Sequence, residues 1–268
     1  MKADELLDKL HPREIADELR MYFKKIIESG VSSFQQKFKL AIDSEPFLRA
    51  LRAGLVVQAA QIFAGFQTVL RYFPNVLEMC GMKSSALATQ LPLISALLTC
   101  LGFACTLMFI DRVGRRILMT SSLIVITIVH LGMGLIVKTN SKHDQMEENG
   151  VSGFAGVLFY FVFFLAYAIG IGAITPIYNS ESFECPFSVL GMGLSNLFCW
   201  TLSLLIGFFF VPVASSLKAE GTFYLSFGFS LLGLIAVYLL VPETLQKSPE
   251  EILELMKHKF KPWPFNNR

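Results

Sequence analysis

The sequence has few charged residues for its length. Only 16% of the 268 residues are charged, whereas charged residues make up about a quarter of an average soluble domain. The hydrophobic share is 53%, and the apolar residues form long blocks between clusters of charge. This pattern argues against a large soluble core and indicates an integral membrane protein.

Cysteine is also scarce and is not arranged to hold a metal. The five cysteines show no C-x-x-C spacing, and most lie inside or beside apolar runs, where a free thiol behaves as a small hydrophobic group. They are Cys80, Cys100, Cys105, Cys185 and Cys199. We therefore expect no disulfide framework, no metal site and no cofactor.

Three further signals are missing from the sequence. The net charge is only +2, so no basic surface for a nucleic acid is visible. The stretch MKADELLDKLHPREIADELR at the N-terminus has no apolar h-region, which argues against a cleaved signal peptide. Nothing resembles a P-loop, so ATP-driven transport by this chain is not expected.

What the sequence does contain is six apolar blocks of roughly 20 residues, the length needed to cross about 30 Å of hydrocarbon. Lipid offers the backbone no hydrogen-bond partners, so each block is expected to be a helix. The fold class that follows is an all-α membrane protein with six transmembrane helices. The blocks are Leu51–Phe73, Ala86–Ile110, Ile117–Val137, Val157–Tyr178, Val189–Ala214 and Tyr224–Val241.

The blocks divide the chain into three parts. Residues 1–50 are polar, and the spacing of Ile15, Leu19 and Phe23 predicts amphipathic helices that lie outside the bilayer. Residues 51–244 form the transmembrane bundle, and residues 245–268 form a tail. If the N-terminus is cytoplasmic, the inner segments hold most of the 23 basic residues. The positive-inside rule then predicts a multi-pass protein with both termini in the cytoplasm.

A compact charged cluster separates the second and third blocks. It consists of Asp111, Arg112, Arg115 and Arg116, and Gly114 allows a tight turn between the two helices. One interpretation is a topology anchor at the cytoplasmic face. A second interpretation is half of a gate, because the other inner turn carries Glu181 and Glu184 and no basic residue. Opposite charges on neighbouring turns can pair in one conformation and separate in another.

A few polar and aromatic side chains interrupt the apolar blocks. Gln58 and Gln61 share a helical face, and Gln67 lies about 120° away from Gln61 around the helix. Amides and an aromatic plate such as Trp200 suit the hydroxyls and C–H faces of a sugar. Hydrogen bonds between helices for the glutamines, and ordinary packing for Trp200, are the alternatives. His130 is interpreted as a packed polar residue.

Four stretches carry a family resemblance. The cluster at 111–116, Asp-Arg-Val-Gly-Arg-Arg, resembles the D-R-x-G-R-R loop signature of the major facilitator superfamily. QIFAGFQTVLRYF, TPIYNSESFE and VPETLQKSPEEI resemble motifs of its sugar porters. The NSE tripeptide is most similar to the proton-linked inositol transporters of plants, and hexose porters come next. The resemblance implies helices seven to twelve of a twelve-helix fold, with part of the cytoplasmic linker in front and the first six helices absent.

The resemblance also implies a substrate site. Gln61 matches the first glutamine of the family motif, and Gln67 stands in place of its asparagine. Trp200 occupies the position of the aromatic platform, while Thr99 and Ser203 fall where asparagines are common.

The chain departs from the family pattern at four further positions. Ile62 replaces the second glutamine, and Arg71 replaces a tyrosine. Pro176 replaces a tryptophan, and Ser188 replaces the arginine that follows the glutamate motif.

The function implied is transport of a sugar or polyol of the hexose or myo-inositol class across the plasma or vacuolar membrane. The full-length form is expected to be a proton-linked symporter. None of the six blocks contains Asp or Glu, so this chain cannot supply proton coupling by itself. An N-terminal half is the expected partner, besides the bilayer and the substrate. The alternative is a non-transporting membrane partner or regulator of a full-length transporter.

An intramembrane enzyme is not favoured. A serine protease would need a serine nucleophile beside a histidine base. Ser195 and His130 form the only candidate pair, and the G-x-S-G pattern is absent around Ser195. We therefore expect that the protein is not an enzyme.

Overall fold

The computed structural model describes residues 34–66, 69–70, 85–142, 150–183 and 187–257. These residues are mostly helical, and the described part of the chain contains no β-strand. The helices are α3 (Phe34–Asp43), α4 (Glu45–Phe63), α6 (Ser85–Val113), α7 (Arg115–Lys142), α8 (Gly150–Ile169), α9 (Ile171–Ser182), α10 (Ser188–Leu240) and α11 (Pro249–Lys257).

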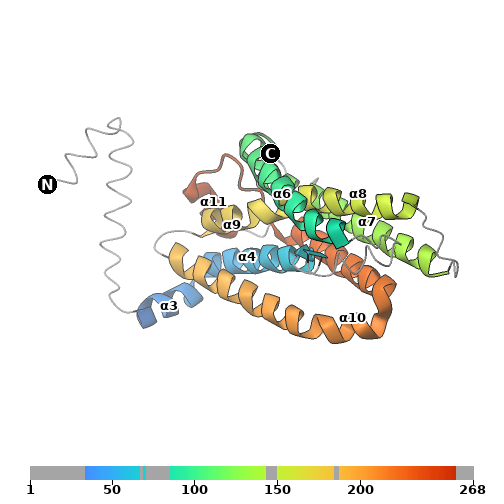
Figure 1. Cartoon of the computed structure of the whole chain (residues 1–268). Coiled ribbons are helices and arrows are strands. Elements are labelled where there is room, and N and C mark those ends of the chain that lie inside the picture. The colour runs from blue at the N-terminus through green and yellow to red at the C-terminus, as the bar shows by residue number, and fades with distance from the viewer. Residues whose placement is uncertain (1–33, 67–68, 71–84, 143–149, 184–186, 258–268) are drawn as a thin grey trace.

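The long helices lie side by side and form one elongated bundle (Figure 1). α10 folds back on itself in this view, so it supplies two legs, Ser188–Phe210 and Glu220–Leu240. Pro212 lies inside the helix between the two legs, where its missing N–H favours a bend. α10 packs against both α4 and α7 and is the central element of the bundle.

Five stretches of the described residues are long and apolar enough to cross a membrane. They agree with five of the six predicted blocks to within a few residues, and they are Gln90–Val113, Arg115–Thr139, Phe154–Ser182, Ser188–Phe210 and Glu220–Leu240. The first predicted block begins within α4 and continues past Leu70, where it leaves the described residues. α4 starts at Glu45, so this helix runs across the boundary predicted at residue 50. The predicted helix around Leu19 also lies outside the described residues.

The fourth predicted block is interrupted at Gly170, where α8 ends and α9 begins. The backbone N–H of Ile171 donates to Ser122 Oγ of α7 at 2.9 Å. The hydroxyl of Thr106 on α6 lies 3.1 Å and 3.0 Å from the carbonyl oxygens of Ala168 and Ile169. Neighbouring side chains therefore satisfy backbone groups at the break, as a bilayer without water requires.

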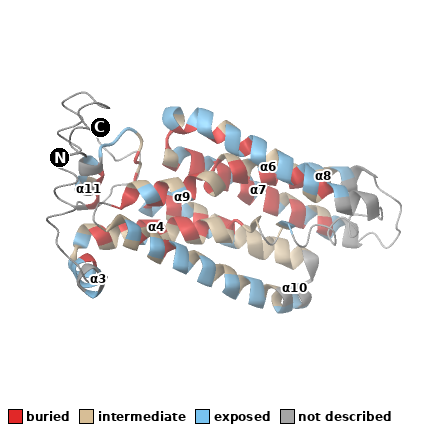
Figure 2. Cartoon of the chain, turned by 60° about the vertical axis from the view of Figure 1, so that its left-hand side comes forward, coloured by how far each residue is buried: buried red, intermediate tan, exposed pale blue. Residues whose placement is uncertain are grey.

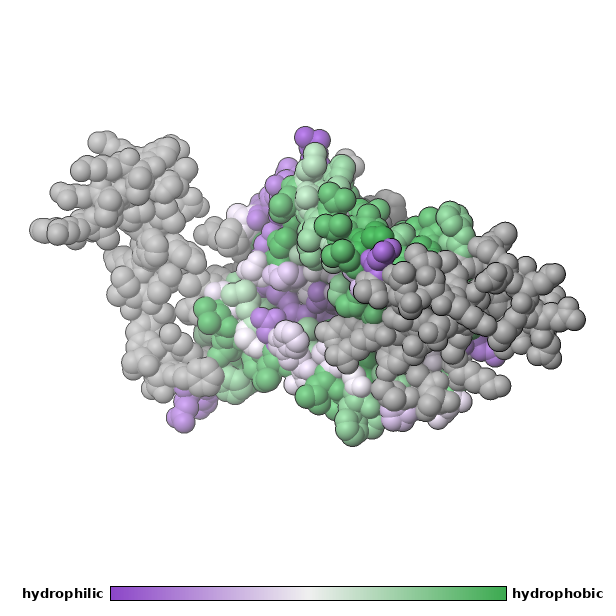
Figure 3. Space-filling model, viewed as in Figure 1, coloured by the Kyte–Doolittle hydropathy of each residue, from purple (hydrophilic) through white to green (hydrophobic). Residues whose placement is uncertain are grey.

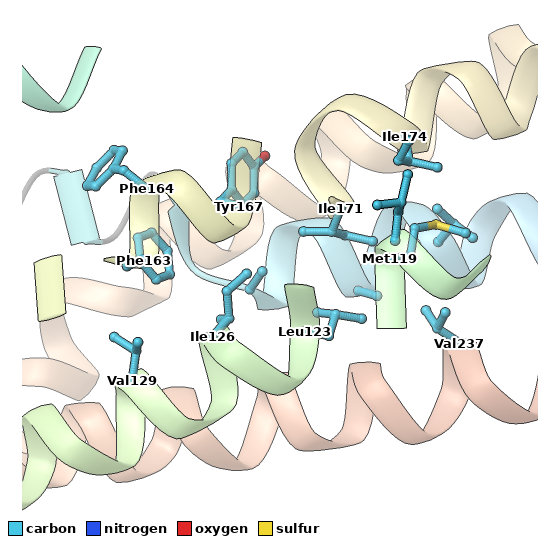
Figure 4. Packing of buried hydrophobic residues seen from close by; sticks show 14 of the residues in the cluster. Met119, Leu123, Ile126, Val129, Phe163, Phe164, Tyr167, Ile171, Ile174 and Val237 are labelled. Atoms are coloured by element: carbon cyan, nitrogen blue, oxygen red, sulfur yellow. The ribbon is translucent and has the colours of Figure 1, made fainter. Parts of the chain in front are cut away.

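The core lies between α7, α8, α9 and the second leg of α10. Met119, Leu123 and Ile126 are spaced to face one side of α7, and they are fully buried. They belong to one cluster with apolar side chains of α8, α9 and α10 (Figure 4). The outward faces of α6 and α10 are exposed and apolar (Figure 2). A bundle with an apolar inside and an apolar outside is suited to a bilayer.

α3, α9 and α11 lie at one end of the bundle, beside the start of α4 (Figure 1). Arg49 of α4 donates from Nη1 to the carbonyl oxygen of Met256 at 3.3 Å, and basic side chains commonly satisfy the last carbonyls of a helix in this way. The same guanidinium pairs with Glu45 at 2.9 Å. This arginine therefore ties α11 to the first helix of the bundle.

Candidate functional site

A cavity of about 280 Å³ lies between α4, α8, α9 and the first leg of α10. Its polar and aromatic lining includes Gln58, Gln61, Phe66, Tyr167, Asn196, Trp200 and Ser203. In the space-filling view, hydrophilic surface appears in the middle of the molecule, between hydrophobic areas above and below (Figure 3). The cavity, which we call the pocket, is large enough for a single small molecule.

Amide groups from two helices meet in the pocket. Gln58 Nε2 donates to Asn196 Oδ1 at 3.3 Å, which links α4 to α10. Gln61 Nε2 donates to the carbonyl oxygen of Gly172 at 3.3 Å, which links α4 to α9. Gln58 Oε1 has no hydrogen-bond partner among the described residues. Each amide carries both a donor and an acceptor, so the group can recognise hydroxyls in either sense.

Aromatic rings provide the other wall. The Phe66 ring stacks on that of Tyr167, with centroids 4.4 Å apart and an interplanar angle of 24°. Trp200 lines the pocket while 69% of the residue remains exposed. Flat apolar rings beside amides suit a ligand that has both C–H faces and hydroxyls.

The structure brings three of the five predicted substrate residues together. Gln61, Trp200 and Ser203 line the pocket. Thr99 lies on α6, where its hydroxyl donates to the carbonyl oxygen of Ser95 at 2.7 Å, and it is not part of the pocket lining. Gln67 lies outside the described residues.

Sequence reasoning missed Asn196, although it is the only asparagine in the fifth apolar block. Asparagine is costly inside a membrane and usually has a role there. The same cost singled out Gln58 and Gln61 in the sequence, so Asn196 could have been predicted in the same way. Asn196 lies 138 positions after Gln58 in the chain, so the hydrogen bond between them is visible only in the fold.

The charged cluster lies at the same end of the bundle as α11, and we call this region the charged end. Arg115 Nη2 pairs with Glu181 Oε1 at 2.9 Å, and its Nη1 donates to the carbonyl oxygen of Ile110 at 3.1 Å. Its contact with the exposed Asp111 is longer, at 3.4 Å. Thr244 Oγ1 donates to Glu181 Oε2 at 2.8 Å. One guanidinium therefore joins the ends of α6, α7 and α9.

Glu243 is the residue at this end that sequence reasoning did not single out. Its two carboxylate oxygens accept from the backbone N–H groups of Arg115 and Arg116, both at 3.0 Å. Oε1 also accepts from the N–H groups of Thr244 at 3.0 Å and Leu245 at 3.1 Å. A carboxylate at the start of α7 satisfies orphan donors and faces the positive end of the helix dipole. The sequence feature that could have identified Glu243 is its position directly after the last apolar block.

The remaining members of the cluster divide between the interior and the surface. Gly114 has a φ of +99°, and a Cβ there would lie 2.8 Å from Glu243 Oε2, so the turn requires glycine. Arg116 is buried, with its guanidinium 5.0 Å from the centre of the Tyr238 ring and a hydrogen bond to the Tyr238 carbonyl oxygen. Arg112 is exposed at the end of α6.

A model of the family described as "Sugar (and other) transporter" matches residues 1–256. The chain belongs to this sugar transporter family. Curated members with similar sequences include inositol transporter 4 of Arabidopsis thaliana, which is 26% identical over 97% of this chain and 57% of its own length. Myo-inositol transporter 2 of Schizosaccharomyces pombe is 29% identical over 97% of this chain and 47% of its own length. The chain thus spans about half the length of these sugar transporters.

Two solved structures of XylE share the fold of this chain. A double-tryptophan variant superimposes with a TM-score of 0.72 at 19% identity, over 95% of this chain and 51% of XylE. The major facilitator superfamily proton:xylose symporter XylE bound to 6-bromo-6-deoxy-D-glucose gives a TM-score of 0.65 at 18% identity, with the same coverage. The bundle therefore has the architecture of one half of a major facilitator fold.

Proposed function

We propose that this chain takes part in the transport of a sugar or polyol of the hexose or myo-inositol class across a membrane. The observation that carries the proposal is the pocket, in which Gln58, Gln61 and Asn196 supply amides and Trp200 supplies an aromatic face. Several relatives are inositol transporters by name. A polyol has hydroxyls for the amides and C–H bonds for the ring, so its chemistry complements that of the lining.

A second six-helix bundle would complete the site. The pocket is walled by α4, α8, α9 and α10, yet Trp200 is 69% exposed. The relatives are about twice as long as this chain, and substrate sites of such transporters lie between two repeats at the midplane of the membrane. The partner bundle, on the same or another polypeptide, would cover Trp200 and close the pocket from the opposite side.

The charged end would act as the cytoplasmic gate of the pathway. Arg115 holds Glu181 of α9, and α9 also carries Pro176 of the pocket lining. Separation of this ion pair would free α9 and open the route between the pocket and the cytoplasm. The distribution of basic residues supports an orientation with both termini on the cytoplasmic side of the plasma or vacuolar membrane.

Proton coupling in a complete symporter would need a carboxylate from the other bundle. Among the described residues no Asp or Glu lines the pocket. Asp111, Glu181 and Glu243 lie at the charged end and have structural partners there. A carboxylate that titrates beside the substrate in the pocket would therefore come from the second half.

The test is equilibrium binding of tritiated myo-inositol and D-glucose to the purified chain in lipid nanodiscs. We expect Gln61→Ala and Trp200→Ala each to weaken binding by roughly tenfold, about 1.4 kcal/mol. Thr127→Val is the matched control, because its buried hydroxyl donates to Leu123 within α7 and lies away from the pocket. Wild-type affinity in both pocket variants, or no binding of either compound to the wild-type chain, would contradict the assignment.

Uptake by cells that lack hexose and inositol transporters tests the need for a second bundle. We expect uptake only when a six-helix first half of a related transporter is expressed together with this chain. Uptake by this chain alone would show that it needs no second bundle.

A further inference from the structure

A second group of polar side chains lies deeper than the pocket, towards the charged end. It comprises Asn179 of α9 and Ser195 of α10, which face Gly54 of α4. Asn179 is 3% exposed and Ser195 is 0% exposed. Three helices of the bundle therefore meet at a buried polar position, which we call the inner constriction.

The inner constriction is notable for its unused hydrogen-bonding groups. Neither Nδ2 nor Oδ1 of Asn179 has a hydrogen-bond partner among the described residues, and the same holds for Ser195 Oγ. Gln58 Oε1, one helical turn further along α4 from Gly54, is buried and unpaired in the same way. Buried polar groups are nearly always paired, so several unpaired ones together indicate a place where another molecule supplies the partners.

Gly54 lets Asn179 and Ser195 approach the backbone of α4 closely. A Cβ on this glycine would lie 2.6 Å from Asn179 Oδ1 and 3.1 Å from Ser195 Oγ. Both oxygens therefore face the same point on α4. Any side chain at position 54 would occupy the point on which the two polar groups converge.

The constriction lies between two cavities in the order of residues along α4 and α9. On the side of the pocket, its neighbours are Gln58 of α4 and Asn196 of α10. On the other side is a cavity of about 60 Å³ whose lining includes Ala50 of α4 and Glu181 of α9. A molecule that moves from the pocket towards the charged end would thus pass the inner constriction before it reaches Glu181.

We propose that Gly54, Asn179 and Ser195 form a second hydroxyl-binding subsite for a polyol on its way between the pocket and the charged end. This inference rests on the proposed function. Asn179 offers a donor and an acceptor, and Ser195 offers a hydroxyl that can act as either. A cyclic polyol with a hydroxyl on every ring carbon presents one of them to the subsite in any orientation while the rest of the ring stays beside Trp200.

The experiment measures binding of tritiated myo-inositol and melting temperature for the same set of variants of the full chain in nanodiscs. Ser195→Ala removes only the unpaired hydroxyl, Asn179→Leu removes the unpaired amide at similar volume, and Gly54→Ala fills the space between them. We expect each to weaken binding roughly threefold to tenfold, the effect of one or two lost hydrogen bonds. We expect the melting temperatures of Ser195→Ala and Asn179→Leu to be unchanged or raised, because the polar atoms of both side chains have no hydrogen-bond partner among the described residues.

Ser226→Ala is the matched control for the serine substitution. Its hydroxyl donates to the carbonyl oxygen of Thr222 within α10 at 3.0 Å, and we expect unchanged myo-inositol binding. Wild-type affinity in Ser195→Ala and Asn179→Leu would overturn the subsite and leave ordered water as the partner of these groups. A lowered melting temperature in both variants would equally overturn it, because the side chains would then have a structural role.

Failure of the subsite can be told apart from failure of the proposed function. Wild-type binding of myo-inositol that is lost in Gln61→Ala but kept in all three variants of the inner constriction would reject the subsite alone. No myo-inositol binding to the wild-type chain, with none of the probe retained at millimolar concentration, would reject the proposed function and the subsite with it.

Discussion

The charged end and the pocket use polar groups in opposite ways. At the charged end, Glu243 accepts four backbone N–H groups, and Arg115 bonds both a carboxylate and a carbonyl oxygen. In and below the pocket, Gln58, Asn179 and Ser195 are buried with polar atoms that have no partner among the described residues. Polar groups at the charged end hold helices together, whereas several polar residues in the middle keep atoms available for another molecule.

The difference separates stability from recognition. A satisfied buried network rigidifies a structure, while an unsatisfied group costs free energy that another molecule can recover when it binds. Substitutions at the charged end should therefore lower stability, and substitutions in the pocket should lower binding with little change in stability. The four predictions below test this division, from the largest expected effect to the smallest.

Glu243→Ala should have the largest effect. It removes the carboxylate at the start of α7 and leaves the N–H groups of Arg115 and Arg116 without their partner, so we expect a loss of about 3 kcal/mol in unfolding free energy. The measurement is chemical or thermal unfolding in detergent. Glu45→Gln is the control, because the Glu45 side chain is 77% exposed and a surface pair contributes less than about 1 kcal/mol. Equal unfolding free energies of Glu243→Ala and Glu45→Gln would show that Glu243 does not stabilise the charged end.

Gly114→Ala should be next, at about 2 kcal/mol, because a side chain at positive φ is strained. The Cβ would also press on Glu243 Oε2 at 2.8 Å. Gly193→Ala is the matched control within α10, where a Cβ meets nothing within 4 Å, and its stability should stay level or rise. If both glycine variants unfold at the same temperature, the turn does not depend on its left-handed backbone.

Asn196→Ala should affect binding more than stability. It loses one hydrogen bond from Gln58, 3.3 Å long, so we expect about 0.5 kcal/mol of destabilisation and roughly fivefold weaker binding of tritiated myo-inositol. Parallel melting and binding curves on one preparation provide the measurement. A large drop in melting temperature with intact binding would show that Asn196 stabilises the fold, and would contradict the division between the charged end and the pocket.

Asp111→Asn should have the smallest effect. Asp111 is 81% exposed and lies 3.4 Å from Arg115, so its loss should change the unfolding free energy by less than about 0.5 kcal/mol. Thermal unfolding at low and high salt would measure this change. A loss as large as that in Glu243→Ala would mean that the exposed carboxylate, and not the buried contacts of Arg115, holds the turn.

Much of the fold was predictable, because the bilayer imposes one length and one secondary structure on each span. The second, third, fifth and sixth blocks agree with the spans of the structure. The break between α8 and α9 was not predictable from hydropathy, since both sides of Gly170 are apolar. The groups that satisfy it, Ser122 and Thr106, lie on two other helices.

The site was only partly predictable. Gln61 and Trp200 could be singled out because glutamine and tryptophan are uncommon within apolar helices. Both line the pocket. Thr99 has a polar group of the same kind, but its hydroxyl is used within its own helix. The contact between Arg115 and Glu181 was expected from charge, whereas the role of Glu243 depends on backbone donors, which carry no mark in a sequence.

α9 connects the two regions mechanically. It is a rod of 12 residues, about 18 Å long, with Pro176 at the pocket and Glu181 at the charged end. The break at Gly170 frees it from α8, and borrowed hydroxyls satisfy the backbone at that point. Pro176 and Glu181 lie on the same side of this joint, so a rotation of α9 about Gly170 would move both in the same direction and would move Glu181 further than Pro176.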